Sequence, residues 1–180
     1  MRWEESVLAL FEDLEQQAEG LHLAERDAEI GELSVSEYAQ VSLGSRIHAS
    51  TNQVVRVRLL GGRSITGRLA QSGREWLLLE DAPGHEWVVP QISVATVSGL
   101  STKSLNEDAW PIHVRLSLRS ILRRIAQARS EIVVHLTDGS QFEGRLGRVG
   151  KDFVEVYPAA VSVRAAEAVP NIAIAAIQGR

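Results

Sequence analysis

The feature that most constrains this chain of 180 residues is an internal repeat, in which residues 54–99 are matched by residues 131–179. Glycines recur 77 positions apart, and after a three-residue insertion the last apolar positions recur 80 positions apart. Spaced glycines that recur in phase with apolar positions indicate a duplicated module. The matched pairs are Gly62–Gly139, Gly67–Gly144, Gly73–Gly150, Val89–Val169, Pro90–Pro170, Ile92–Ile172 and Gly99–Gly179.

Each copy has the pattern of a series of short β-strands. Residues 54–59 alternate apolar and basic side chains, which is the period-two pattern of a half-buried strand, and Gly61-Gly62 then predicts a hairpin turn. Four more apolar runs follow, and Pro90, which lacks an amide hydrogen, is expected at the corner between the last two strands. Five short strands, with a glycine inside the second, are too few for a sandwich and predict a small closed barrel.

Helical patterns occupy most of the remaining chain. Apolar residues recur every three or four positions in the acidic N-terminal segment, and helices are also expected at about residues 43–50 and in the stretch that ends near Arg129. The predicted fold class is therefore α+β, a helical hairpin followed by two five-stranded barrels that are each preceded by a helix. The predicted segments are residues 1–41 for the acidic hairpin, 42–100 for the first barrel, 101–130 for a linker with a helix, and 131–180 for the second barrel.

The second strand of each copy is written GRSITGRL at residues 62–69 and GSQFEGRL at residues 139–146. A helix followed by five strands with this glycine spacing resembles the Sm-like superfamily, which includes the Sm and LSm proteins and bacterial RNA chaperones; small SH3-like barrels have a similar pattern. The resemblance implies a tandem of Sm-like barrels that associate edge to edge, because exposed strands are templates for further pairing. Two fused barrels could pair with each other, pair across a dimer or close a small ring.

The positions that hold a uracil base in typical Sm sequences differ in this chain. In that family an aspartate follows the second strand and an asparagine lies in the third, whereas this chain has a glycine there, followed by Leu77 in one copy and Val154 in the other. An aliphatic side chain cannot hydrogen-bond to a base. The corner reads Val-Pro-Gln-Ile and Val-Pro-Asn-Ile, so Gln91 and Asn171 remain as polar barrel-corner candidates, either for binding or as solvent-facing turn residues.

Charge is distributed unevenly along the chain, whose net charge is −4. Residues 1–50 carry a net charge of −8, and residues 101–130 carry +4. A stripe of arginines on the linker helix could neutralise phosphates, since guanidinium binds phosphate bidentately, or it could pair with the acidic segment or border an interface. No aromatic residues lie between these arginines, so a base-stacking platform is not expected. The candidate nucleic-acid-binding residues are Arg115, Arg119, Arg123 and Arg124 of the linker, with Arg56, Arg58 and Arg68 of the first barrel.

The sequence lacks the patterns of catalysis and metal binding. The chain has no cysteine, its five histidines are scattered without a metal-binding spacing, and neither a nucleophile elbow nor a phosphate-binding loop is found. We therefore predict no enzyme activity, no catalytic residue, no metal and no cofactor. No apolar run reaches about 18 residues and the N-terminus lacks an apolar leader, so a cytoplasmic protein without a membrane partner is expected.

Two function classes remain open from the sequence. The first is a non-catalytic assembly or regulatory module whose partner is a second copy or another protein, with homo-oligomers expected. The alternative is an RNA- or DNA-associated regulator that binds the phosphate backbone through the arginines of the linker helix. A small-molecule substrate is not indicated, because no polar cluster converges. The two classes differ in salt dependence, since phosphate binding weakens steeply with ionic strength.

Overall fold

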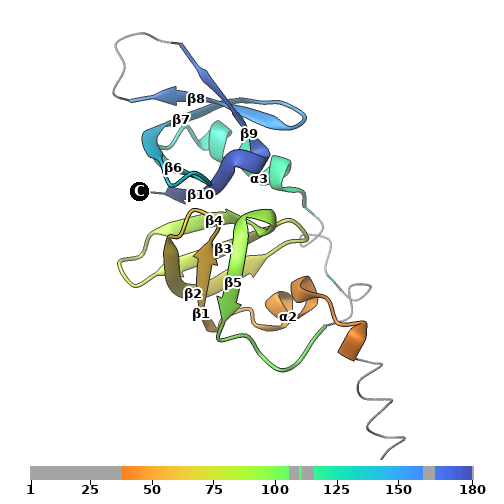
Figure 1. Ribbon diagram of the computed structural model, residues 1–180. Helices are drawn as coiled ribbons and strands as arrows, with labels where there is room; N and C mark the ends of the chain where they lie inside the picture. The colour runs from red at the N-terminus through yellow and green to blue at the C-terminus, as the bar shows by residue number, and fades with distance from the viewer. Residues whose placement is uncertain (1–37, 106–109, 111–115, 160–164, 180) are drawn as a thin grey trace, which may run out of the picture. The chain divides into compact units, whose positions relative to one another are not determined.

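The computed structural model describes residues 38–105, 110, 116–159 and 165–179 (Figure 1). The chain divides into two compact units, Met1–Val41 and Ser42–Arg180. The predicted acidic helical hairpin falls in the first unit, and apart from residues 38–41 it lies outside the described residues. Both copies of the repeat belong to the second unit.

The first copy of the repeat, residues 42–100, is called the first half. It begins with helix α2 (Leu43–Ala49), which Ser42 caps by accepting a hydrogen bond from the Ser45 amide at 3.1 Å. Strands lie where the apolar runs predict them, and Pro90 ends the fourth strand. The elements that follow α2 are β1 (Val54–Leu59), β2 (Ser64–Ser72), β3 (Trp76–Asp81), β4 (Glu86–Pro90), the 3-10 helix η1 (Gln91–Ser93) and β5 (Val94–Ser98).

The second half, residues 116–179, has the same order of elements. It begins with helix α3 (Leu118–Ala128), which Ser117 caps by accepting a hydrogen bond from the Ser120 amide at 3.3 Å. Pro170 ends its fourth strand, as Pro90 does in the first half. The elements that follow α3 are β6 (Ile132–Leu136), β7 (Gln141–Val149), β8 (Phe153–Pro158), β9 (Glu167–Pro170), the 3-10 helix η4 (Asn171–Ala173) and β10 (Ile174–Gly179).

All ten strands belong to one open antiparallel sheet with the order β5-β1-β2-β3-β4-β10-β6-β7-β8-β9. Within each half the last strand pairs with the first, and the other strands follow in sequence order. The halves are joined where β4 pairs with β10, with Ile177 opposite Val88 and Gln178 opposite Trp87 (Figure 1). We call this pair of strands the junction.

The predicted fold class of two separate five-stranded barrels behind a helical hairpin is wrong. The described residues contain one continuous sheet with α2 and α3 as its helices, because the fourth strand of one copy pairs with the last strand of the other. The two hydrophobic clusters also exchange side chains across the junction. Ala175 and Ala176 of β10 pack in the cluster of the first half, while Trp76 and Val88 pack in the cluster of the second. Neither half therefore has a core made from its own residues alone.

Glycines permit a close main-chain approach between the long second strand of each half and the third strand, with which it pairs. A Cβ atom added at Gly67 in β2 would collide with the carbonyl oxygen of Glu80, and one added at Gly144 in β7 would collide with that of Tyr157. The mid-strand glycine expected from the sequence is thus required by a backbone approach that leaves no room for a side chain.

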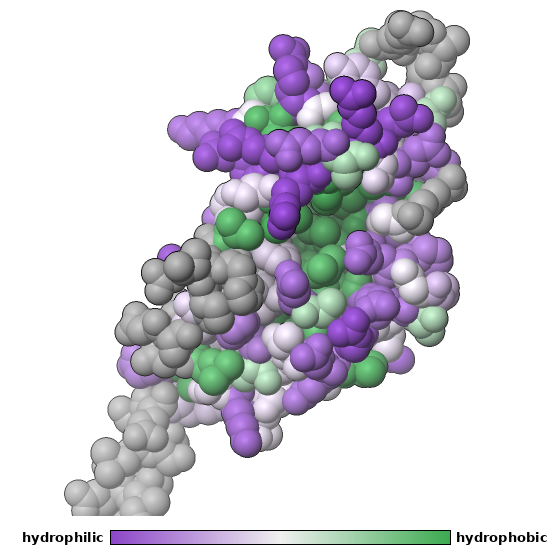
Figure 2. Space-filling view, turned by 180° about the vertical axis from the view of Figure 1, so that it is seen from behind, coloured by the Kyte–Doolittle hydropathy of each residue, from purple (hydrophilic) through white to green (hydrophobic). Residues whose placement is uncertain are grey.

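Hydrophobic and hydrophilic side chains separate on the surface seen in Figure 2. Apolar residues gather in a hollow near the middle of this face, and hydrophilic residues dominate the end formed by the second half (Figure 2). Among the described residues, no helix is both long enough and apolar enough to cross a membrane.

Candidate binding groove

A groove of about 740 Å³ lies at the corners that η1 and η4 form in the two halves. Its lining is largely duplicated, because most of its residues occupy equivalent positions of the repeat. The start of α3 completes it with Ser117, Leu118 and Arg119. The duplicated pairs are Arg74–Lys151, Glu75–Asp152, Pro90–Pro170, Gln91–Asn171 and Ile92–Ile172.

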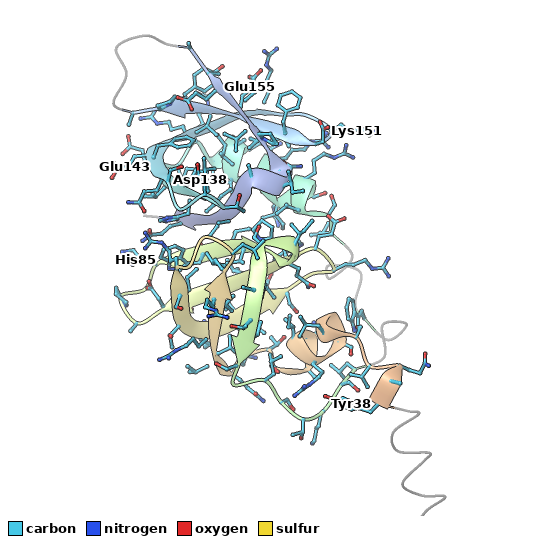
Figure 3. The ribbon with its side chains drawn as sticks, in the orientation of Figure 1. Tyr38, His85, Asp138, Glu143, Lys151 and Glu155 are labelled. Carbon is cyan, nitrogen blue, oxygen red and sulfur yellow. The ribbon has the colours of Figure 1, made fainter. Side chains whose placement is uncertain are left out.

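Main-chain hydrogen bonds position each corner against the hairpin turn beside it. In the first half the Gln91 amide donates to the Glu75 carbonyl at 2.8 Å, and in the second half the Asn171 amide donates to the Asp152 carbonyl at 2.8 Å. Lys151 projects from the corresponding turn between β7 and β8 (Figure 3). The proline that ends the preceding strand fixes the direction in which the chain enters each corner.

The two corners differ in how their amide side chains are bonded. Nε2 of Gln91 donates to the Gly73 carbonyl at 2.8 Å. Asn171 is one methylene shorter, and its side chain has no hydrogen-bond partner in the described part of the chain, although its Oδ1 atom is buried. Leaving a buried acceptor unpaired costs about 1–3 kcal/mol. The second corner therefore presents an acceptor that lacks a donor.

The charges in the groove leave positive groups without partners. Glu75 is engaged, because its Oε2 atom accepts the Leu118 amide at 2.9 Å at the N-terminus of α3, where a carboxylate is favourable. Arg119 and Lys151 have no ion-pair partner among the described residues. With Arg74 the lining holds three cations against the carboxylates of Glu75 and Asp152.

The groove also has an apolar part with unusual exposure. Ile92 is 64% exposed and Ile172 is 68% exposed, and each follows the proline and the amide residue of its corner. Leu118, only 8% exposed, also lines the groove and belongs to the hydrophobic cluster of the second half. None of the described residues that line the groove is aromatic. The site thus combines aliphatic surface, cations and one unpaired acceptor.

The structure brings together residues from two of the sequence-based hypotheses. Arg119 of the linker set lies in the same groove as the barrel-corner candidates Gln91 and Asn171. Arg123 and Arg124 are exposed on α3 outside this lining, and Arg115 lies outside the described residues. The proposed pairing of linker arginines with the acidic N-terminal helices likewise involves residues outside the described part.

The candidates from the first half lie on other strands. Arg56 and Arg58 are exposed on β1, and the Arg56 Nε atom donates to Thr66 Oγ1 at 3.3 Å. Arg68 is engaged on β2, where it forms an ion pair with Glu80 and donates to Asn52 Oδ1 at 3.2 Å. None of these three arginines lines the groove.

The repeat contained a signal for the residues that the hypotheses missed. Arg74 and Lys151 are basic residues that directly follow the matched glycines Gly73 and Gly150. Ile92 and Ile172 directly follow the corner amides. A functional residue of a duplicated module is expected at equivalent positions, so comparing the copies would have selected these four side chains.

A second distinctive environment lies at the junction, where His135 of β6 is only 4% exposed. Its ring stacks on Trp87 with centroids 5.1 Å apart, and its Nε2 atom is 3.4 Å from Gln178 Oε1. Burial, followed by the charge of Arg63, lowers the pKa of His135 below its ordinary value. The described residues contain no group of three or more His, Asp or Glu side chains able to hold a metal ion.

No protein-family model matches this chain, and no curated protein matches it. The groove offers cations, a buried amide oxygen without a partner among the described residues and exposed isoleucines as groups for binding.

Proposed function

We propose that this protein is a non-catalytic assembly module that associates with protein chains, second copies of itself first among them, through the outer edges of its sheet. The observation that supports the proposal is the junction, where two copies of the repeat within one chain are already joined edge to edge. The positions that meet at the junction recur at the ends of the sheet. β5 is equivalent to β10, and β9 is equivalent to β4.

The outer edges of β5 and β9 are the open ends of the sheet in the described part of the chain. Main-chain amide and carbonyl groups along such an edge are a template for another strand. One chain thus presents at its two ends the same pair of strands that bind each other at its centre. A contact between β9 of one copy and β5 of the next would be heterologous, so it would close a ring or continue as a filament.

The junction also predicts the register of such a contact. Shifting its pairs by the repeat spacing of 80 places Val97 opposite Ala168 and Ser98 opposite Glu167 of a second copy. Both Ser98 and Glu167 are exposed in the single chain. A carboxylate introduced at position 98 would therefore face a carboxylate, whereas an ammonium group would face its opposite charge.

The test is the mass of the protein as a function of concentration, measured by light scattering behind a sizing column. We expect the native chain to grow by whole multiples of its mass. Ser98→Glu should require a several-fold higher protein concentration for the same increase in mass. The reason is that like charges directly opposite each other across paired strands destabilise the pairing by about 0.2–1 kcal/mol. Ser98→Lys is the matched control and should not weaken association. A monomeric native chain at every concentration would contradict self-assembly.

The second candidate function is binding of an RNA or DNA backbone by α3. It is favoured by one observation, that Arg119 and Arg123 lie one turn apart, exposed and without ion-pair partners among the described residues. Fluorescence anisotropy with mixed short RNA and DNA at low and moderate salt tests it. Salt-sensitive binding that the Arg119→Glu/Arg123→Glu variant abolishes would support this function, and no binding at low salt would exclude it.

A relationship of the repeat unit to the Sm-like superfamily is part of the proposal. It is supported by the order of a capped helix and five antiparallel strands in each copy, with a corner after the fourth strand. A cytoplasmic location likewise stays a prediction, for which the absence of cysteine is the supporting feature.

A further inference from the structure

We propose that the groove between the two corners binds an acidic peptide segment with aliphatic side chains, contributed by a partner protein. This function is separate from edge-to-edge assembly, because the lining of the groove includes neither Ser98 nor Glu167. A partner bound in the groove would contact both halves of one chain at once. Three features of the groove select the chemistry of the partner.

The first feature is the pair of exposed isoleucines. Ile92 and Ile172 extend from equivalent corners and are flanked by Pro90 and Pro170. Covering such aliphatic surface with another aliphatic side chain removes both from water, which is favourable in proportion to the area buried. Because the isoleucines come from two copies of one motif, they are suited to a segment with repeated leucine-like side chains.

The second feature is the unpaired Oδ1 atom of Asn171. Because this atom is buried, the Asn171 side chain would have to rotate toward the groove before Oδ1 could accept from a main-chain N–H of a bound peptide. The equivalent Gln91 differs, since its Nε2 atom donates to the Gly73 carbonyl and so anchors its side chain to the main chain. Neither Gln91 nor any other described group supplies a donor to Asn171 Oδ1.

The third feature is charge. Although the whole chain carries −4, the described lining includes cations, and its carboxylate Glu75 is already bonded to the start of α3. Arg119 and Lys151 are without carboxylate partners among the described residues, and Asp152 follows Lys151 directly in the sequence. Glutamate or aspartate side chains of a peptide would complement the two cations.

The same features favour a peptide over a nucleic acid in this groove. Single-stranded nucleic acid is bound by stacking of its bases on aromatic side chains, and the part of the lining that the structure describes contains none. The isoleucines offer no hydrogen bonds to base edges. The groove is therefore better matched to aliphatic side chains than to bases.

The experiment measures the anisotropy of a short fluorescein-labelled peptide that alternates glutamate and leucine. Its controls are a version with lysine for glutamate, a version with serine for leucine, and a single-stranded oligonucleotide. We expect the acidic apolar peptide to bind more tightly than all three. Arg119→Glu and Lys151→Glu should each weaken its binding roughly tenfold or more, because they place a carboxylate against a carboxylate.

A matched control variant comes from the same helix. Arg124→Glu makes the same change of charge on an exposed arginine of α3 that does not line the groove, so it should leave peptide binding nearly unchanged. Asn171→Gln should weaken binding several-fold while keeping the fold, because the longer side chain can reach its own main chain as Gln91 does. Ile172→Ser, at an exposed position, tests the apolar contact independently of charge.

Three results would overturn the proposal. One is equal binding of the acidic, basic and serine peptides. Another is an equal loss of peptide affinity in Arg119→Glu and Arg124→Glu, which would show that the peptide is attracted to the charge of α3 as a whole. The third is tighter binding of the oligonucleotide, lost in the same groove variants, which would make the groove a nucleic-acid site. The edge variant Ser98→Glu should bind peptide normally, so failure of the groove and failure of self-assembly are distinguishable.

Discussion

The junction strands β4 and β10 and the end strands β9 and β5 are copies of the same two strands in different surroundings. Ala176 in β10 is completely buried, whereas its equivalent in β5, Thr96, is exposed. Val88 in β4 is 8% exposed, and its equivalent in β9, the smaller Ala168, is exposed. Equivalent strands therefore have apolar side chains at the junction, where they pair within the chain. They have small or polar side chains at the two ends of the sheet.

The first strands of the two halves show the same contrast. β1 alternates exposed and buried residues, as its period-two pattern predicts, and its Arg58 faces solvent. In β6 the equivalent position is His135, which is buried and stacks on Trp87 of the first half. Because four consecutive residues of β6 are buried, this strand is covered on both faces, whereas β1 is covered on one. The halves share a plan, but the first strand of the second half lies next to junction strand β10, whereas β1 lies between β5 and β2.

The largest expected effect comes from a charge placed in the junction. Ala176→Glu should destabilise the fold by about 3–5 kcal/mol, because it buries an unpaired carboxylate. Thr96→Glu, the equivalent change at the end strand, should cost less than about 0.5 kcal/mol. Urea denaturation at low protein concentration gives both free energies of unfolding. Similar values for the two variants would show that the junction is not the buried interface described.

The next effect concerns the aromatic residues that lie three positions after the matched glycines Gly73 and Gly150. Trp76 is 3% exposed, packs in the cluster of the second half and donates from Nε1 to the Leu116 carbonyl at 2.8 Å. Trp76→Ala should therefore cost about 3 kcal/mol, whereas Phe153→Ala, at a residue that is 37% exposed, should cost about 1 kcal/mol. The measurement is thermal unfolding.

Trp76→Ala also tests whether the halves unfold together. Because Trp76 belongs to the first half but packs in the core of the second, the variant should lower the midpoint of a single transition for the whole sheet. Two separate transitions, with only one of them shifted, would mean that the halves are independent after all.

A smaller effect is expected from pH. The pKa of His135 is lowered in the folded chain by burial and then by Arg63, so the unfolded chain takes up the proton first as pH falls. The contribution of neutral His135 to the free energy of unfolding is complete above the ordinary histidine pKa of about 6.5. It is lost as pH falls toward the lower pKa of the folded chain, and the free energy of unfolding then falls by at most about 1.4 kcal/mol per pH unit. Urea denaturation at several pH values measures this slope.

The control for the pH effect is His135→Phe, which keeps a ring to stack on Trp87 and removes the titrating group. Over the same pH range its stability should vary less steeply than that of the native chain. An unchanged slope would assign the pH dependence to groups away from the junction.

The strands and corners could be predicted from the sequence because their causes are local. Alternation in residues 54–59, the missing amide hydrogen of Pro90 and the crowding at Gly67 act within a few residues or between adjacent strands. The pairing of whole strands could not be predicted in this way. The hydrophobic pattern of β5 and β10 does not indicate whether the strand that pairs with each belongs to the same copy or to the other copy. Closed barrels were therefore expected, and one open sheet is found.

The candidate groove could be predicted in part. Gln91, Asn171 and Arg119 were selected from the sequence on separate grounds, as corner amides and as a linker arginine, and the fold places them in one lining. Their proximity could not be predicted, because these residues are far apart in the sequence and the two halves are joined at the junction. Ile92 and Ile172 were noted only as matched positions of the repeat, because their exposure depends on the three-dimensional fold.

The most direct test of the central claim is a charge swap across the contact between β5 and β9, followed by sedimentation velocity. In the register derived from the junction, Ser98→Glu alone should weaken self-association, and Ser98→Glu combined with Glu167→Lys should restore it, because the new carboxylate then faces an ammonium group. Recovery of the native sedimentation profile by the double variant is the predicted result. Association that is unaffected by the single change, or that the second change does not restore, would contradict edge-to-edge assembly in this register.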